Sequence, residues 1–129
     1  MSVNFVFGAL LPWLGLVIGA GLGLGALAAP ERMLSFVGLA AAAPEGLAEA
    51  RATYGGLFLA LEVGAAALWV SHNSTDGLVV AGLAWIGAAA GRVVSLAVDG
   101  RRTARNGQAV AFELFIGLAH VAALFWPAG

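Results

Sequence analysis

Two acidic residues and one arginine lie inside apolar stretches long enough to cross a membrane: Glu62, Glu113 and Arg92. A charged side chain at that depth is costly and rarely faces lipid, so it needs a partner inside the protein. Such a residue is a candidate for proton transfer, for binding a charged head group, or for a structural ion pair. The partners of these three residues are therefore the first thing to predict.

Depth in the membrane can be estimated from the helical rise of about 1.5 Å per residue. By this measure Arg92 and Glu113 lie at about the same depth, roughly 10 Å from the cytoplasmic ends of their spans. Glu62 lies deeper, but within reach of the long arginine side chain. We expect Arg92 to pair with Glu113, with Glu62 as the competing acid.

Other polar residues lie on the same faces and predict a polar seam between spans two, three and four. The expected seam consists of Arg51, Tyr54, Glu62, Arg92, Ser95, Asp99, Glu113 and His120. If Arg92 is the only cation of the seam, the seam contains more acid than base. Charge balance then requires a protonated glutamic acid, a charged His120 or an Arg51 that reaches inward. The seam either carries a function or is a structural network that locks the helices together.

His120 is the single histidine expected inside the membrane. Small residues flank it: Gly117, Ala119, Ala122 and Ala123. We expect a histidine satisfied within the seam and no cofactor; the alternative is haem or bacteriochlorophyll ligated by His120. The segment around it is similar over about ten residues to the C-terminal part of bacterial antenna polypeptides, where a histidine ligates bacteriochlorophyll. The chain has no cysteine and no paired-histidine motif, so no metal site is expected.

The composition indicates what positions these residues. The chain has 129 residues, of which 61% are hydrophobic and 10% charged, whereas soluble domains average about a quarter charged. Four apolar runs of about 20 residues, each enough to span a bilayer, use nearly the whole chain. We therefore expect a single all-α domain, an integral membrane four-helix bundle with spans at about 3–29, 45–70, 77–98 and 109–126. Lysine is absent and the net charge is −1, so no nucleic-acid partner is expected.

Glycines at four-residue spacing are expected to bring these helices together. They are Gly15, Gly19 and Gly23 in the first span, and Gly87 and Gly91 in the third. Small residues at this spacing let two helix backbones approach closely. We favour packing within the chain over dimerisation.

The arginines predict the orientation. The loops after spans one and three carry Arg32, Arg51, Arg101, Arg102 and Arg105. The positive-inside rule places these loops in the cytoplasm and both termini outside, with Trp69 and Trp126 at the outer interface. The stretch 30–43 is too short to span and starts with Pro30, so we expect a short interfacial helix there.

One set of residues carries a family resemblance. The run 51–56 (RATYGG), then Gly91-Arg92 with Ser95 and Asp99-Gly100, then Glu113, resembles the family called domain of unknown function 4345. The resemblance runs from about Glu49 to Leu118. It implies a small bacterial four-helix membrane protein, and hence a multi-pass protein of the bacterial inner membrane. The family has no assigned activity, so the resemblance implies no reaction.

The function classes follow from these expectations. The leading interpretation is a non-enzymatic structural or accessory subunit of a larger membrane complex, in contact with lipids and with other subunits or further copies of itself. The alternative is a small transporter, or a membrane protein that binds a lipid or a cofactor, using Glu62, Arg92 and Glu113. An enzyme ranks last, because no nucleophile–base arrangement, phosphate loop or metalloprotease motif is present.

Overall fold

The computed structural model describes residues 2–100 and 102–125. Every regular element of this part is helical. In chain order the helices are α1 (Val3–Phe5), α2 (Leu11–Ala28), α3 (Pro30–Val37), α4 (Pro44–Glu49), α5 (Phe58–His72), α6 (Asp76–Val98) and α7 (Ala104–Phe125), with π-helical segments η1 (Val6–Leu10) and η2 (Ala50–Leu57). The all-α class expected from the sequence is therefore confirmed.

Four continuous helical stretches are long and apolar enough to cross a membrane. They are Val3–Ala28, Pro44–His72, Asp76–Val98 and Ala104–Phe125. The fourth begins well before residue 109, where the apolar run starts, because the polar segment after Thr103 is already helical. These four stretches support a multi-pass membrane protein.

Local sequence explains where several helices begin and end. Pro30 and Pro44 stand at the first positions of α3 and α4, where the missing N–H of proline costs no intrahelical hydrogen bond. Gly38 ends α3 with a φ of 82°, a left-handed conformation that favours glycine. Asn73 ends α5 in the same way, with a φ of 50°. Asparagine tolerates this conformation better than most residues.

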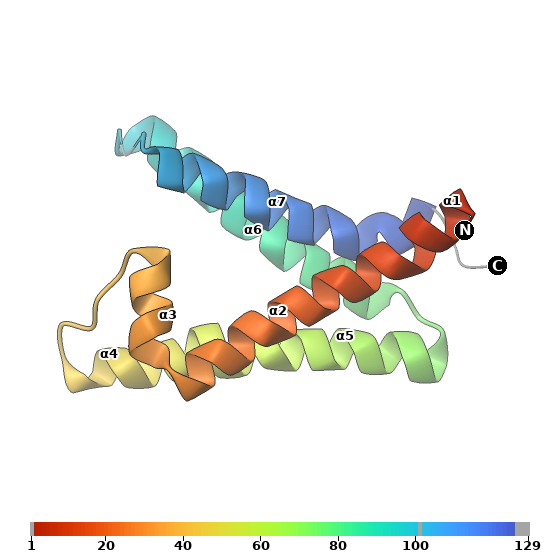
Figure 1. Ribbon diagram of the computed structural model, residues 1–129, viewed down its shortest axis with the longest axis horizontal. Helices are drawn as coiled ribbons and strands as arrows, with labels where there is room; N and C mark the ends of the chain where they lie inside the picture. Colours follow the sequence, from red (N-terminus) through yellow and green to blue (C-terminus); the bar gives the residue numbers. More distant parts are fainter. Residues whose placement is uncertain (1, 101, 126–129) are drawn as a thin grey trace.

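The four long stretches converge at one end and diverge at the other (Figure 1). Helices α6 and α7 run side by side, and α2 crosses from α7 to α5. The turn between α5 and α6 lies at the converging end, together with α1. At the other end α3 stands across the direction of the long helices, between the end of α2 and the α6–α7 pair (Figure 1). This is the arrangement expected of a short interfacial helix.

Close helix contacts form at several glycines, among them Gly23, Gly82 and Gly117. A Cβ built on Gly23 would lie 2.9 Å from the Leu59 backbone nitrogen, so α2 meets α5 backbone to backbone there. Gly82 and Gly117 face each other, because a Cβ on either would lie 2.9 Å from the carbonyl oxygen of the other. Small residues permit this approach between α6 and α7.

The packing role expected for Gly87 and Gly91 is wrong. A Cβ built on either residue would meet no atom within 4 Å, and both glycines are exposed. The reason is that α6 contacts α7 through Gly82, on a different face of the helix. The four-residue spacing predicted the kind of contact but not the face that makes it.

Candidate functional site

A fully buried polar group lies where α2, α5, α6 and α7 converge. It consists of Glu62, Trp85 and His120, and we call it the closed group. Glu62 Oε1 accepts a hydrogen bond from the Trp85 indole N–H at 2.9 Å, and Glu62 Oε2 lies 2.7 Å from His120 Nε2. The side chains of Glu62 and His120 are 1% and 0% exposed. Both carboxyl oxygens therefore have a partner without any water.

The hydrogen bonds of His120 define its ring protonation. Nδ1 lies 2.8 Å from the Ile116 carbonyl oxygen. A carbonyl can only accept, so Nδ1 carries a hydrogen. The second ring nitrogen and Glu62 Oε2 then share one hydrogen between them, as a neutral pair or as an ion pair. In either form, this one hydrogen satisfies both His120 Nε2 and Glu62 Oε2.

The glycine stripe of α2 makes room for this group. A Cβ on Gly19 would lie 2.1 Å from Glu62 Oε1, and one on Gly15 would lie 2.7 Å from His120 Nδ1. Any side chain at these two positions would displace the polar atoms. Gly15 and Gly19 were expected to bring two backbones together; they accommodate polar side chains instead. Only Gly23 of this stripe meets a neighbouring backbone.

His120 does not fit the role of axial ligand to haem or bacteriochlorophyll. Both ring nitrogens are engaged, Nδ1 with Ile116 and Nε2 with Glu62, and the side chain is fully buried. The small residues beside it are also in use, since Gly117 packs against Gly82 and Ile86. The space that suggested a macrocycle is filled by helix contacts.

A second polar pair joins α6 to α7 nearer the diverging end. Arg92 Nε donates to Glu113 Oε1 at 2.8 Å, which is the pairing that equal depth predicted. The Arg92 side chain is 31% exposed and that of Glu113 is 10% exposed. Glu113 Oε2 is buried and has no hydrogen-bond partner among the described residues. We call this pair the open group.

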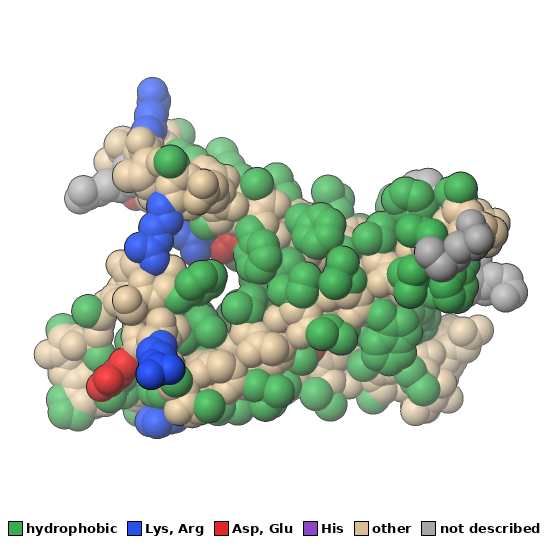
Figure 2. Space-filling model, in the orientation of Figure 1, with side chains coloured by type: hydrophobic (Ala, Val, Ile, Leu, Met, Phe, Trp, Pro, Cys, Tyr) green, Lys and Arg blue, Asp and Glu red, His purple; other side chains and the backbone are tan. Residues whose placement is uncertain are grey.

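The open group lies in the wall of a large cavity. The cavity has a volume of about 830 Å³ and lies between α3 and η2 on one side and α6 and α7 on the other. Figure 2 shows the hollow at the diverging end of the molecule, with arginine side chains on both sides of it. Its polar lining comprises Thr53, Tyr54, Arg92, Ser95, Arg105, Asn106, Gln108 and Glu113. Most other lining residues are apolar, so the cavity is amphipathic.

Three aromatic rings form a continuous wall of this cavity. Tyr54 stacks on Phe58 with ring centroids 6.3 Å apart and planes at 11°. Phe58 in turn contacts Trp85 at 5.1 Å, with planes tilted by 45°. Trp85 also donates to Glu62, so this residue of the closed group lies between the cavity and Glu62.

Arg105 spans the mouth of the cavity. From the start of α7 its guanidinium donates to the carbonyl oxygens of Ser35, at 2.8 Å, and Phe36. Both carbonyls belong to the last turn of α3, where helix carbonyls attract cations; the Ser35 carbonyl also accepts from the Gly38 N–H. Met33, Phe36 and Val37 of α3 line the cavity. The side chain of Arg105 therefore ties α3 to the α6–α7 pair.

The remaining polar residues do not join one continuous seam. Arg51 is exposed, and its Nε donates to the Leu27 carbonyl at 3.1 Å instead of reaching inward. Ser95 donates to Asp99 at 2.7 Å on the exposed surface of α6. Arg51, Tyr54 and Asp99 are therefore not joined by hydrogen bonds in the described part of the chain. Helix α2 also takes part, because its glycines hold the closed group.

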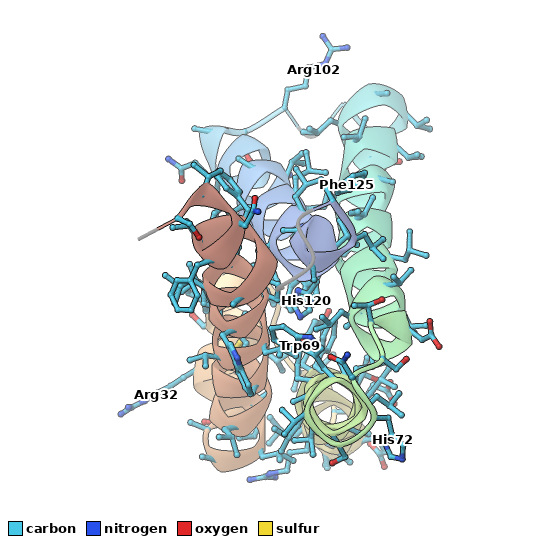
Figure 3. The ribbon with its side chains drawn as sticks, turned by 90° about the vertical axis from the view of Figure 1, so that its right-hand side faces the viewer. Arg32, Trp69, His72, Arg102, His120 and Phe125 are labelled. Carbon is cyan, nitrogen blue, oxygen red and sulfur yellow. The ribbon has the colours of Figure 1, made fainter. Side chains whose placement is uncertain are left out.

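Figure 3 places His120 between the helices, whereas Arg32 and Arg102 extend away from them. Trp69 lies at the converging end and contacts Trp13, with ring centroids 5.4 Å apart. The predicted membrane orientation also uses Arg101 and Trp126, and these two residues lie outside the described part of the chain.

Sequence reasoning missed Trp85 and Arg105 as site residues. Trp85 stands seven residues before Arg92, a spacing that puts both on one helix face, and its indole is a donor that a buried acid needs. That signal could have found it. The bonds from Arg105 to backbone carbonyls of α3 leave no trace in the sequence pattern.

The chain matches a family model over nearly its whole length. The family described as "Domain of unknown function (DUF4345)" matches residues 9–124. This range includes the first span, which the resemblance seen in the sequence did not cover. No curated protein and no solved structure matches the chain. The open group, the aromatic wall and the glycines of α2 all lie within the matched range, and the chain belongs to the DUF4345 family.

Proposed function

We propose that the protein is a non-enzymatic membrane protein that binds one amphiphilic molecule in the cavity between α3, η2, α6 and α7. The observation that carries this proposal is the cavity itself. Its volume of about 830 Å³ lies in the range of small-molecule sites. Apolar and aromatic side chains line one part and the open group another, which matches a molecule with an apolar chain and a polar head.

Entry from the membrane is supported by the position of α3. This helix lies across the direction of the long helices at their diverging end (Figure 1). Its residues Met33, Phe36 and Val37 line the cavity, and its link to α7 is the side chain of Arg105. A molecule from the adjoining leaflet would thus pass the Arg105 side chain, whereas the converging end is closed by the Gly82–Gly117 contact. One-sided access supports binding more than passage across the membrane.

The test is uptake of lipid by the purified full chain, measured by native mass spectrometry. Ala88 lines the cavity, so Ala88→Phe should fill it and remove one bound lipid. Ala90→Phe adds the same ring to the exposed side of α6 and serves as the matched control. Equal lipid binding by the two variants would reject the proposal.

The orientation stays a prediction of the positive-inside rule, with the arginine-rich end in the cytoplasm. A reporter fused after residue 129 that is active only in the cytoplasm would overturn it. The role as an accessory subunit of a larger complex also stays a prediction. Proteins that co-purify in mild detergent at fixed stoichiometry would support it.

A further inference from the structure

The guanidinium of Arg92 is only partly used by the protein. Its Nε donates to Glu113 Oε1, and no hydrogen bond to either Nη nitrogen is present among the described residues. Arg92 lines the cavity and its side chain is 31% exposed. A guanidinium presents five N–H donors in a planar fork that matches phosphate and carboxylate oxygens. Arg92 can therefore hold Glu113 and an oxyanion together.

Glu113 offers the complementary feature. Its Oε2 is buried and has no donor among the described residues. A buried acceptor without a partner is unfavourable and calls for an explanation, such as a bound group. Since Glu113 lines the cavity, a donor could reach Oε2 from there after a small side-chain movement. A hydroxyl group would meet this need.

The charges of the lining define the sign of the head group. Arg92, Arg105 and Glu113 are the charged residues that line the cavity within the described part of the chain. The one acid is already paired with Arg92, so a cationic head would face arginine without a free carboxylate. An anion fits this environment better than a cation.

We infer that the ligand is a membrane lipid whose head group combines a phosphate with a hydroxyl, held by Arg92 and Glu113. This inference rests on the proposed function. The phosphate oxygens accept from the Nη nitrogens of Arg92, and the hydroxyl donates to Glu113 Oε2. The first part of the acyl chains lies against Tyr54, Phe58 and Trp85, which form the aromatic wall. No covalent step is involved.

The experiment compares three lipids with identical oleoyl chains on the delipidated full-length protein. Phosphatidylglycerol has phosphate and hydroxyl, phosphatidylcholine has phosphate without hydroxyl, and diacylglycerol has hydroxyl without phosphate. Binding to the cavity is the part that Ala88→Phe removes and Ala90→Phe keeps. Phosphatidylglycerol should bind about tenfold more tightly than either of the others, which corresponds to one charge-assisted hydrogen bond.

Two variants test the residues. The double variant Arg92→Leu with Glu113→Leu removes both members of the pair, and it should reduce the preference for phosphatidylglycerol over the other two lipids to about twofold or less. Arg92→Lys keeps a cation beside Glu113, so it serves if the double variant does not fold. A single ammonium lacks the fork that spans two acceptors, so the preference should fall several-fold.

The outcomes separate the two proposals. Equal cavity binding of the three lipids would overturn the head-group inference and leave the proposed function standing. No cavity-specific binding of any lipid would overturn both. Displacement of phosphatidylglycerol by millimolar inorganic phosphate would assign the site to soluble phosphate esters and so overturn a lipid ligand. A preference unchanged in both Arg92 variants would remove this residue from the site.

Discussion

The closed group and the open group contain similar residue pairs but differ in burial and in hydrogen bonding. Each joins a glutamate on one long helix to a basic side chain on another, with contacts of 2.7 and 2.8 Å. In the closed group both oxygens of Glu62 have partners and no part of the pair reaches a cavity. In the open group Glu113 Oε2 has no partner among the described residues, and Arg92 borders a large cavity.

This difference separates a structural role from a binding role. A buried polar group with every hydrogen bond made stabilises one packing and leaves nothing to offer a ligand. A group with unused donors and an unused acceptor beside a cavity can bind a ligand. Substitutions should therefore affect mainly stability at the closed group and mainly ligand binding at the open group.

The largest effect on stability is expected at Glu62. Glu62→Leu leaves the Trp85 N–H and His120 Nε2 buried without partners, so the free energy of unfolding should fall by about 3–5 kcal/mol. Glu62→Gln can accept from Trp85 and donate to His120, so it should lose much less. Unfolding in mixed micelles, followed by circular dichroism, measures both. Equal losses for Leu and Gln would show that the hydrogen bonds are not what holds the group.

A somewhat smaller loss of stability is expected when a side chain is added to a glycine of α2 that contacts the closed group. Gly19→Ala puts a methyl group 2.1 Å from Glu62 Oε1, and forcing such a contact costs roughly 1–3 kcal/mol. Gly21→Ala is the matched control, because a Cβ there meets nothing within 4 Å. It should be neutral or slightly stabilising. The same unfolding assay measures both variants. If Gly21→Ala were also destabilising, the loss would come from a change in α2 itself and not from contact with the closed group.

Substitutions in the open group should lower stability less, and the effects of substituting Arg92 and Glu113 should not be additive. Arg92→Leu or Glu113→Leu alone leaves one charge without its partner, but partial exposure of Arg92 limits the loss to about 1–2 kcal/mol. The double variant should recover much of this loss. A double-mutant cycle on the free energy of unfolding measures the coupling. Strictly additive losses would mean that the 2.8 Å contact contributes no net energy.

The smallest effect is expected at the two exposed glycines near the open group. Gly87→Ala and Gly91→Ala fill open space on α6, and alanine is the better helix former, so each should raise stability by about 0.5–1 kcal/mol. A loss at Gly87 would indicate that this face of α6 is covered by another chain or another copy, whereas a loss at Gly91, which lines the cavity, would indicate a contact with the bound molecule. The unfolding assay and the oligomeric state should then be measured together.

The sequence by itself determined the parts of this protein that depend on local order. Apolar runs predicted the four long helices, since a helix satisfies its own backbone in lipid. Helical rise placed Arg92 and Glu113 at one depth, and these two residues are paired in the structure. The arginine and glycine motifs from Arg51 to Glu113 indicated the family, which matches residues 9–124.

Tertiary structure alone decided which faces meet. The pairing of Glu62 with His120 depends on the space that Gly15 and Gly19 leave on a helix far away in sequence. Gly87 and Gly91 have the same spacing as that stripe but face open space. Periodicity defines the faces of one helix, whereas the crossing of neighbouring helices selects the face that is buried. The cavity exists because the helices diverge at one end, and no run of residues encodes that divergence.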